Sequence, residues 1–248
     1  MAATVEINLD RKLYVGQYDI SGQANELTMP WGREELDAKA SGDATNLKRF
    51  GLETCSATAK IYSVANTNVD DYAFGLVNAG TINMPVTMCT RAGTTGQTAY
   101  FLDATAMRYN TSFPVGQLPM ADFYLPPTSQ KLVRGFILQP KATITTTGDG
   151  TAYQLGAVAA TQYLYAAIHV FSASGTLPTL DVVIANSATE GGSYTTRGTF
   201  TQKTAAGYQF LTPVVGAPFT DTWWRVSRTI GGTNTPTFSC AVIVGIQR

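Results

Sequence analysis

The chain has 248 residues, of which 44% are hydrophobic and only 14% charged, so we expect a sizeable core beneath a surface made largely of uncharged polar residues and glycine. Lysine plus arginine and aspartate plus glutamate each number 17, which excludes a net field that would draw a polyanion or an anionic membrane from a distance. The three cysteines, Cys55, Cys89 and Cys240, are odd in number, far apart and without a C-x-x-C pattern paired with histidine, which argues against a disulfide framework or a zinc site, and we expect them as small core residues.

The first 140 residues predict mainly β structure. The start, MAATVEINLDRK, lacks the long apolar segment of a secretory signal, which favours synthesis in a reducing cytoplasm. Alternation of apolar and polar residues predicts strands in KLYVGQYDI, ANELTMPW, TCSATAKIYS, MPVTMCTR, TAYFLDATAMRYNTSF and KLVRGFIL. NVDDYAFGLVNAG instead predicts one short helix, with Asn68 or Asp70 as its N-cap and Gly80 beyond its end.

A change in composition predicts a domain boundary near residue 140. Residues 1–140 hold 13 acidic and 11 basic residues, whereas residues 141–248 hold 4 and 6. Pro140 follows the apolar segment GFIL, and the glycines of GDG at 148–150 favour a turn. We therefore expect two β domains, at 1–140 and 141–248.

The second segment predicts short β-branched strands at regular spacing. The candidate strands are YLYAAIHVFS, TLDVVIAN, TRGTFTQK, GYQFLTPV, DTWWRVSRTI and TFSCAVIVGIQ, with the turn signals SGTLP, EGGS and GGTNTP between several of them. Strands of this kind are typical of a jelly-roll-like or immunoglobulin-like β-sandwich. Trp223 and Trp224 are neighbours in one strand, so one should face the core and the other should be free, for example to stack on a sugar.

The sequence contains no pattern that predicts catalysis. His169 is the only histidine and lies in an alternating strand, which indicates a structural role and excludes a site with several histidine ligands. The acidic pair at 34–35 fits solvated loop charges, and the pair at 70–71 fits the first turn of the predicted helix, so neither indicates two catalytic carboxylates across a cleft. GTTGQT at 93–98 and GDGT at 148–151 fit turns, because the further residues of a phosphate or calcium loop are missing. We expect no enzyme, no cofactor and no metal.

The charged segment near the N-terminus resembles the phage tail tube protein family. The resemblance rests on YDISG at 18–22, on ELD at 35–37 with GDAT at 42–45, and on GL at 51–52, which leads into the alternating strand ATAKI. Ala38, Lys39 and Ala40 depart from the family, which has a threonine-containing run there. The likeness continues more loosely over about the first 140 residues, and the rest of the chain resembles an accessory β-sandwich attached to phage structural proteins.

This resemblance implies a tail-tube-like β-sandwich or barrel with one short helix, and a subunit of stacked hexameric rings in a virion tail. It implies a loop that contacts the next subunit or ring, with both signs of charge to fix register and specificity. The interface residues expected in that loop are Arg33, Glu34, Glu35, Asp37, Lys39, Asp43, Lys48 and Arg49.

The expected partners are further copies of the chain and other phage structural proteins. Double-stranded DNA should pass through the tube without specific binding, because residues 1–140 carry slightly more acid than base, and no membrane partner is expected. Two other functions stay open on the sequence: a head decoration or cement protein, and a carbohydrate-binding module in the C-terminal domain that touches the host surface.

Overall fold

The computed structural model describes residues 10–38, 45, 47–62, 68–80, 83–91, 93–128, 131–214 and 218–247, and confirms a mainly β fold. The chain forms two compact units: unit 1 is Met1–Gly22, Asn83–Leu102 and Val133–Arg248, and unit 2 is Gln23–Ile82 and Asp103–Leu132. Residue 140, the expected boundary, lies inside the continuous strand β11 (Val133–Ile144). The two units therefore differ from the two segments expected from composition, because strands far apart in sequence pair in one sheet.

Unit 1 contains one large antiparallel sheet. Its longest path runs in the order β15, β14, β17, β11, β8, β7, β1, β2, with β12 and β13 paired to β17 and β16 paired to β14. Besides β11, the strands are β1 (Lys12–Val15), β2 (Tyr18–Asp19), β7 (Met84–Cys89), β8 (Thr98–Ala104), β12 (Gly148–Asp149), β13 (Tyr153–Gln154), β14 (Tyr163–Ser187), β15 (Thr195–Thr199), β16 (Gly207–Val214) and β17 (Trp223–Gln247).

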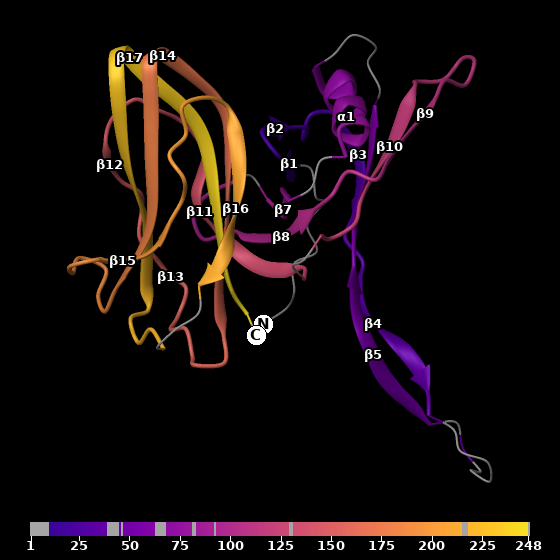
Figure 1. Ribbon diagram of the computed structural model, residues 1–248, viewed down its shortest axis with the longest axis horizontal. Helices are drawn as coiled ribbons and strands as arrows, with labels where there is room; N and C mark the ends of the chain where they lie inside the picture. Colours follow the sequence, from indigo (N-terminus) through magenta and orange to yellow (C-terminus); the bar gives the residue numbers. More distant parts are fainter. Residues whose placement is uncertain are drawn as a thin grey trace. The chain divides into compact units, whose positions relative to one another are not determined.

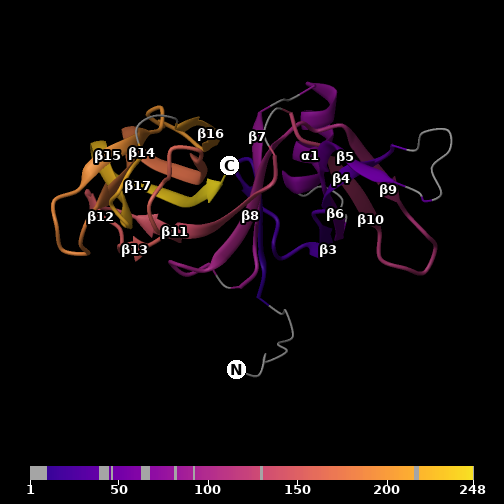
Figure 2. The ribbon, with the colours of Figure 1, turned by 90° about the horizontal axis from the view of Figure 1, so that it is seen from below.

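The strands β14 and β17 pair along their whole length and bend together, so that one sheet makes two layers (Figures 1 and 2). The bend in β14 lies at Gly175 and Leu177, and the bend in β17 at Gly232, all with positive φ. SGTLP and GGTNTP are thus bends within strands, where separate strands were expected. GDG likewise holds the short strand β12 in place of the expected turn.

A first apolar core fills the space between the two layers. Its side chains alternate along β14 and β17, with Ile168 and Leu180 from one strand and Trp224 and Phe238 from the other. The Trp224 side chain is fully buried and donates a hydrogen bond from Nε1 to the carbonyl oxygen of Gly156 at 2.8 Å, whereas Trp223 is only half-buried. The expected opposition of the two tryptophans is confirmed.

A second core lies on the other side of the layer that contains β11 and includes Tyr14, Phe101 and Ile243. The buried His169 ring of β14 connects this strand to two other parts of unit 1. Its Nε2 lies 2.8 Å from the Thr87 hydroxyl and its Nδ1 lies 2.6 Å from the Gly16 carbonyl oxygen. Because a carbonyl only accepts, Nδ1 carries the proton and Nε2 accepts from Thr87. The expected structural role of this histidine is confirmed.

Unit 2 is built on a four-stranded antiparallel sheet in the order β3, β6, β10, β9. Its elements are β3 (Ala24–Thr28), β4 (Trp31–Asp37), β5 (Lys48–Cys55), β6 (Ala57–Tyr62), α1 (Asn68–Asn78), β9 (Arg108–Ser112) and β10 (Met120–Leu125). One face of the sheet buries alternate residues of β6 and β10, among them Ile61 and Phe123, and α1 lies close to this sheet (Figures 1 and 2). The Tyr109 hydroxyl donates a hydrogen bond to Asp70 of α1.

The expected helix is confirmed, with acidic residues Asp70 and Asp71 in its first turn. The Gly80 amide donates a hydrogen bond to the Val77 carbonyl oxygen. Gly80 has a φ of 60°, a conformation that is strained for residues with a Cβ atom but not for glycine. The helix therefore ends where the sequence predicts.

Candidate functional site

The predicted interface residues lie on a β-hairpin that extends from the rest of unit 2 (Figure 1). Strands β4 and β5 pair only with each other and form a separate two-stranded sheet. Of the predicted residues, Arg33, Glu34, Glu35 and Asp37 lie in β4, and Lys48 and Arg49 lie in β5. Lys39 and Asp43 lie outside the described residues. The two ends of the segment expected as a loop are thus strands that pair with each other.

One face of the hairpin carries a row of paired side chains. The Trp31 indole donates from Nε1 to Glu53 Oε1 at 2.7 Å, and the Arg33 guanidinium lies 5.9 Å from the centre of the Phe50 ring. Farther along, Lys48 Nζ lies 2.6 Å from Asp37 Oδ1 and 3.9 Å from Glu35 Oε2. The charges therefore partly neutralise one another on the hairpin, while their side chains remain exposed.

Gly51 allows this hairpin to form where its strands change register. A bulge lies between the pairs Arg33–Glu53 and Glu35–Phe50, so one residue more is accommodated in β5 than in β4. A Cβ atom on Gly51 would lie only 2.9 Å from the Cβ of Glu34. Glycine at this position lets the two backbones approach.

The hairpin exposes large apolar side chains, because its two strands pair with no other strand among the described residues that could cover them. Phe50 is 81% exposed, Leu52 79% and Trp31 59%. An isolated two-stranded hairpin is marginally stable in water, and contiguous exposed apolar surface is typical of an interaction site. The geometry therefore favours a hairpin that another protein surface covers.

Exposed apolar residues are concentrated in unit 2. Among the described residues, thirteen large apolar side chains are exposed, and eleven of them belong to unit 2. Those eleven are Trp31, Leu36, Leu47, Phe50, Leu52, Tyr62, Phe74, Met107, Phe113, Val115 and Leu118. Unit 2 therefore carries the apolar surface that favours association, whereas unit 1 holds only Tyr163 and Leu177 of these thirteen side chains.

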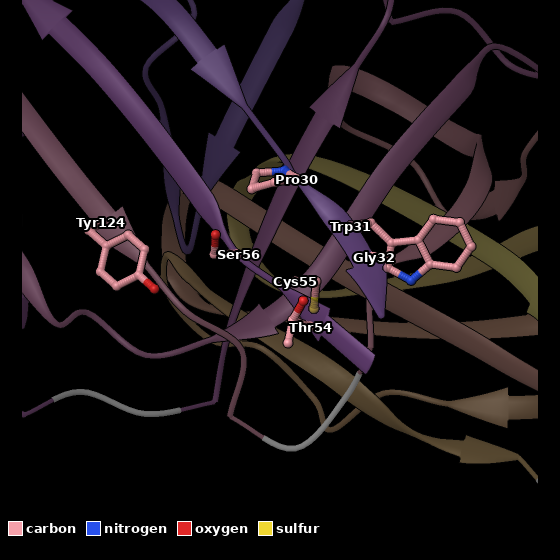
Figure 3. Close-up of a pocket in the computed structure, with 7 residues that line it drawn as sticks. All are labelled: Pro30, Trp31, Gly32, Thr54, Cys55, Ser56 and Tyr124. Carbon is pink, nitrogen blue, oxygen red and sulfur yellow. The ribbon is translucent and has the colours of Figure 1, made fainter. Parts of the chain in front are cut away.

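A pocket of about 350 Å³ lies at the base of the hairpin (Figure 3). It is lined by Pro30, Trp31, Gly32, Thr54, Cys55, Ser56 and Tyr124, none of which carries a charge at neutral pH. In Figure 3 the side chains of Cys55 and Thr54 lie between those of Trp31 and Tyr124. The sequence did not indicate this pocket, because Tyr124 of β10 reaches it only through the folding of unit 2.

Cys55 differs from the other two cysteines. It is partly exposed in the pocket, which corrects the expectation of three core thiols, whereas Cys89 and Cys240 are buried. Burial raises the pKa of the Cys55 thiol, and it raises the pKa of Cys89 and Cys240 to about 12.

A thiol reagent should therefore modify the native protein at one position. We expect slow labelling of Cys55, because little of the thiol is ionised at neutral pH, and no labelling of Cys89 or Cys240. Mass spectrometry of peptides from native and urea-unfolded protein measures this, with three labels expected after unfolding. Rapid labelling of Cys240 in the native protein would contradict its burial in the first core.

The part of the chain that the structure describes offers no group of three or more His, Cys, Asp or Glu side chains suited to a metal ion. Nor does it contain a helix long and apolar enough to span a membrane. The arrangement that stands out is instead the hairpin, the pocket beside it and the apolar surface of unit 2.

No protein-family model matches the chain, and no curated protein matches it in sequence. Among solved structures, the virion of a native gene transfer agent particle contains a chain 7% identical, with a TM-score of 0.40 over 53% of this chain and 98% of that one. The SPP1 tail tube is 12% identical, with a TM-score of 0.40 over 51% of this chain and 77% of that one. The SPP1 Dit protein, described as a hub adsorption apparatus in phages that infect Gram-positive bacteria, is 8% identical, with a TM-score of 0.37 over 96% of this chain and 99% of that one.

Proposed function

We propose that this chain is a non-enzymatic structural protein of a virion, a tail tube subunit that forms stacked homo-hexameric rings around a conduit for double-stranded DNA. It is made in the host cytoplasm and joins other phage structural proteins in the tail. The observation that carries the proposal is the hairpin of β4 and β5, whose strands contain no buried residue, within a unit that holds eleven of the thirteen large apolar side chains exposed among the described residues.

Association would remove this apolar surface from water. Burial of apolar area stabilises a complex by roughly 25 cal/mol per Å² before the costs of association are subtracted. The hairpin carries both signs of charge, at Arg33, Glu35, Asp37 and Lys48. These charges would determine how two subunits align more than how tightly they bind, because exposed ion pairs contribute little energy but disfavour misaligned partners. The sequence likeness of residues 18–61 to tail tube proteins supports the same assignment.

The charge balance fits a conduit. Each phosphate neutralised by Lys or Arg adds salt-dependent affinity, and a strongly basic lining would therefore hold the DNA in place. The chain has 17 basic and 17 acidic residues, so no excess of positive charge favours retention of DNA. The DNA would pass without specific binding.

The assembly role of the hairpin is tested by a charge placed on its apolar surface. Leu52→Asp should abolish oligomers, because Leu52 is 79% exposed in the monomer and an aspartate buried at an interface is costly. Light scattering after size exclusion measures the oligomer, and circular dichroism checks that the variant is folded.

Leu177→Asp serves as the matched control, since Leu177 is 83% exposed but belongs to unit 1. It should assemble like the unmodified chain. If Leu52→Asp assembled as well as this control, the hairpin would not be part of the interface.

A further inference from the structure

The connection between β9 and β10 forms a second apolar projection on unit 2, at residues 113–119. The segment reads FPVGQLP and carries no charge. Phe113 is 65% exposed, Val115 fully exposed and Leu118 68% exposed. Gly116 has a φ of 77° at the turn, and two prolines flank it, so little conformational entropy is left to lose on binding. We call residues 113–119 the β9–β10 tip.

The pocket at the base of the hairpin has a size and a lining that suit such a projection. Its volume of about 350 Å³ is at the lower end of the roughly 300–1,000 Å³ typical of binding clefts. Its lining is uncharged, as the tip is, while charged groups stand at its border: Glu53 holds the Trp31 indole, and the Arg108 guanidinium lies 5.4 Å from the centre of the Tyr124 ring. The pocket therefore favours an apolar, uncharged segment.

The tip and the pocket lie at different ends of unit 2. The tip precedes Met120 at the start of β10, whereas Tyr124 lines the pocket four residues farther along the strand, a rise of about 13 Å. In Figure 1 the β9–β10 connection extends toward the top of the view and the hairpin of β4 and β5 toward the bottom. The tip of one molecule therefore does not fill its own pocket, although a neighbour's tip is free to do so.

We propose that adjacent subunits join head to tail, with the β9–β10 tip of one copy seated in the pocket lined by Trp31, Cys55 and Tyr124 of the next copy. This inference rests on the proposed function and specifies the contact within a ring. A contact between two different patches of the same chain is heterologous, so each subunit keeps one free tip and one free pocket until the ring closes. The contact thus produces rings or filaments and never stops at a dimer.

The native thiol in the pocket provides the test. Phe113→Cys, Val115→Cys and Leu118→Cys are made singly in the full chain, the assembled protein is treated with a copper–phenanthroline oxidant, and products are separated without reductant. Each disulfide forms as two thiols give two electrons to the copper oxidant and release two protons. Because a disulfide requires Cα atoms about 4.4–6.8 Å apart, bonding to Cys55 reports direct contact.

At least one of the three variants should give a ladder of covalent oligomers that extends beyond the dimer, ends at the size of the closed ring and collapses on reduction. Two controls should give monomers: the same variant with Cys55→Ser, and Leu177→Cys, which places an equally exposed thiol on unit 1. Cys89 and Cys240 are buried and should not contribute.

The possible failures are distinguishable. Normal rings under the microscope with no ladder from any of the three variants would overturn the tip-in-pocket contact and leave the proposed function standing. A ladder that stops at the dimer would indicate an isologous contact and also overturn it. Failure of the unmodified chain to form oligomers would overturn the proposed function and this inference together.

Discussion

Trp224→Ala is expected to lower the free energy of unfolding of unit 1 by about 3–5 kcal/mol, the largest single effect that we predict. The Trp224 side chain is fully buried in the first core, packs edge-on against Phe219 and satisfies the Gly156 carbonyl. Its removal leaves both a cavity and a carbonyl oxygen without its partner. Urea unfolding followed by far-ultraviolet circular dichroism measures the loss.

The neighbouring residue provides the matched control. Trp223→Ala removes an identical side chain from the half-buried outer side of the same strand and should cost only about 1 kcal/mol. An equal or larger loss for Trp223→Ala would show that the two layers pack in the opposite sense to the one described here.

Acidification from pH 6.5 to pH 4 is expected to cost up to about 3 kcal/mol through His169, at about 1.4 kcal/mol per pH unit. Complete burial lowers the pKa of His169 from 6.5 to about 4, against a smaller opposing effect of the hydrogen bond to Gly16. In this range the unfolded chain binds a proton that the folded chain does not. The stabilising contribution is therefore complete above pH 6.5 and declines as the pH falls toward 4.

Two aspartates also change the stability with pH, one in a lower pH range than His169 and the other with the opposite sign. Burial would raise the pKa of Asp19, but hydrogen bonds from Lys141 and Ser21 hold it below its usual value, so its contribution is lost only below about pH 3.8. Burial raises the pKa of Asp103, in unit 2, to about 6, so that group stabilises the fold as the pH falls from 6 to 3.8.

His169→Gln isolates the histidine, because glutamine retains a donor and an acceptor but does not titrate, while Asp19 and Asp103 are unchanged. Urea midpoints of both proteins at several pH values between 4 and 7 are compared. The unmodified protein should lose stability more steeply than the variant as the pH falls. Parallel curves would contradict the buried, neutral histidine.

Local patterns in the sequence predicted the features that depend on local physics. Alternation identified the strands of the second segment, the acids at 70–71 and Gly80 fixed the helix, and strand geometry separated Trp223 from Trp224. These signals are strong where one face is buried more than the other, as in the helix and at Trp223 and Trp224, because the residue types then follow the period of the backbone.

Features that depend on distant parts of the chain were not predictable in the same way. Nothing local indicates that SGTLP and GGTNTP bend two strands that remain paired, or that β11 continues through residue 140. The hairpin of β4 and β5 lacks an alternating pattern because neither of its faces is buried within the chain. Its charged residues therefore favoured a loop, and its aromatic residues Trp31 and Phe50 were missed as parts of the candidate surface.

Negative-stain microscopy of the purified, unmodified protein tests the central claim most directly. If the proposed function holds, we expect hollow rings with six-fold symmetry, or tubes of stacked rings, because contact between copies would cover the exposed apolar side chains of unit 2. Discrete compact particles with no central channel, seen even at high protein concentration, would contradict assembly into rings. Order that arises only on added capsids would favour a head decoration protein instead.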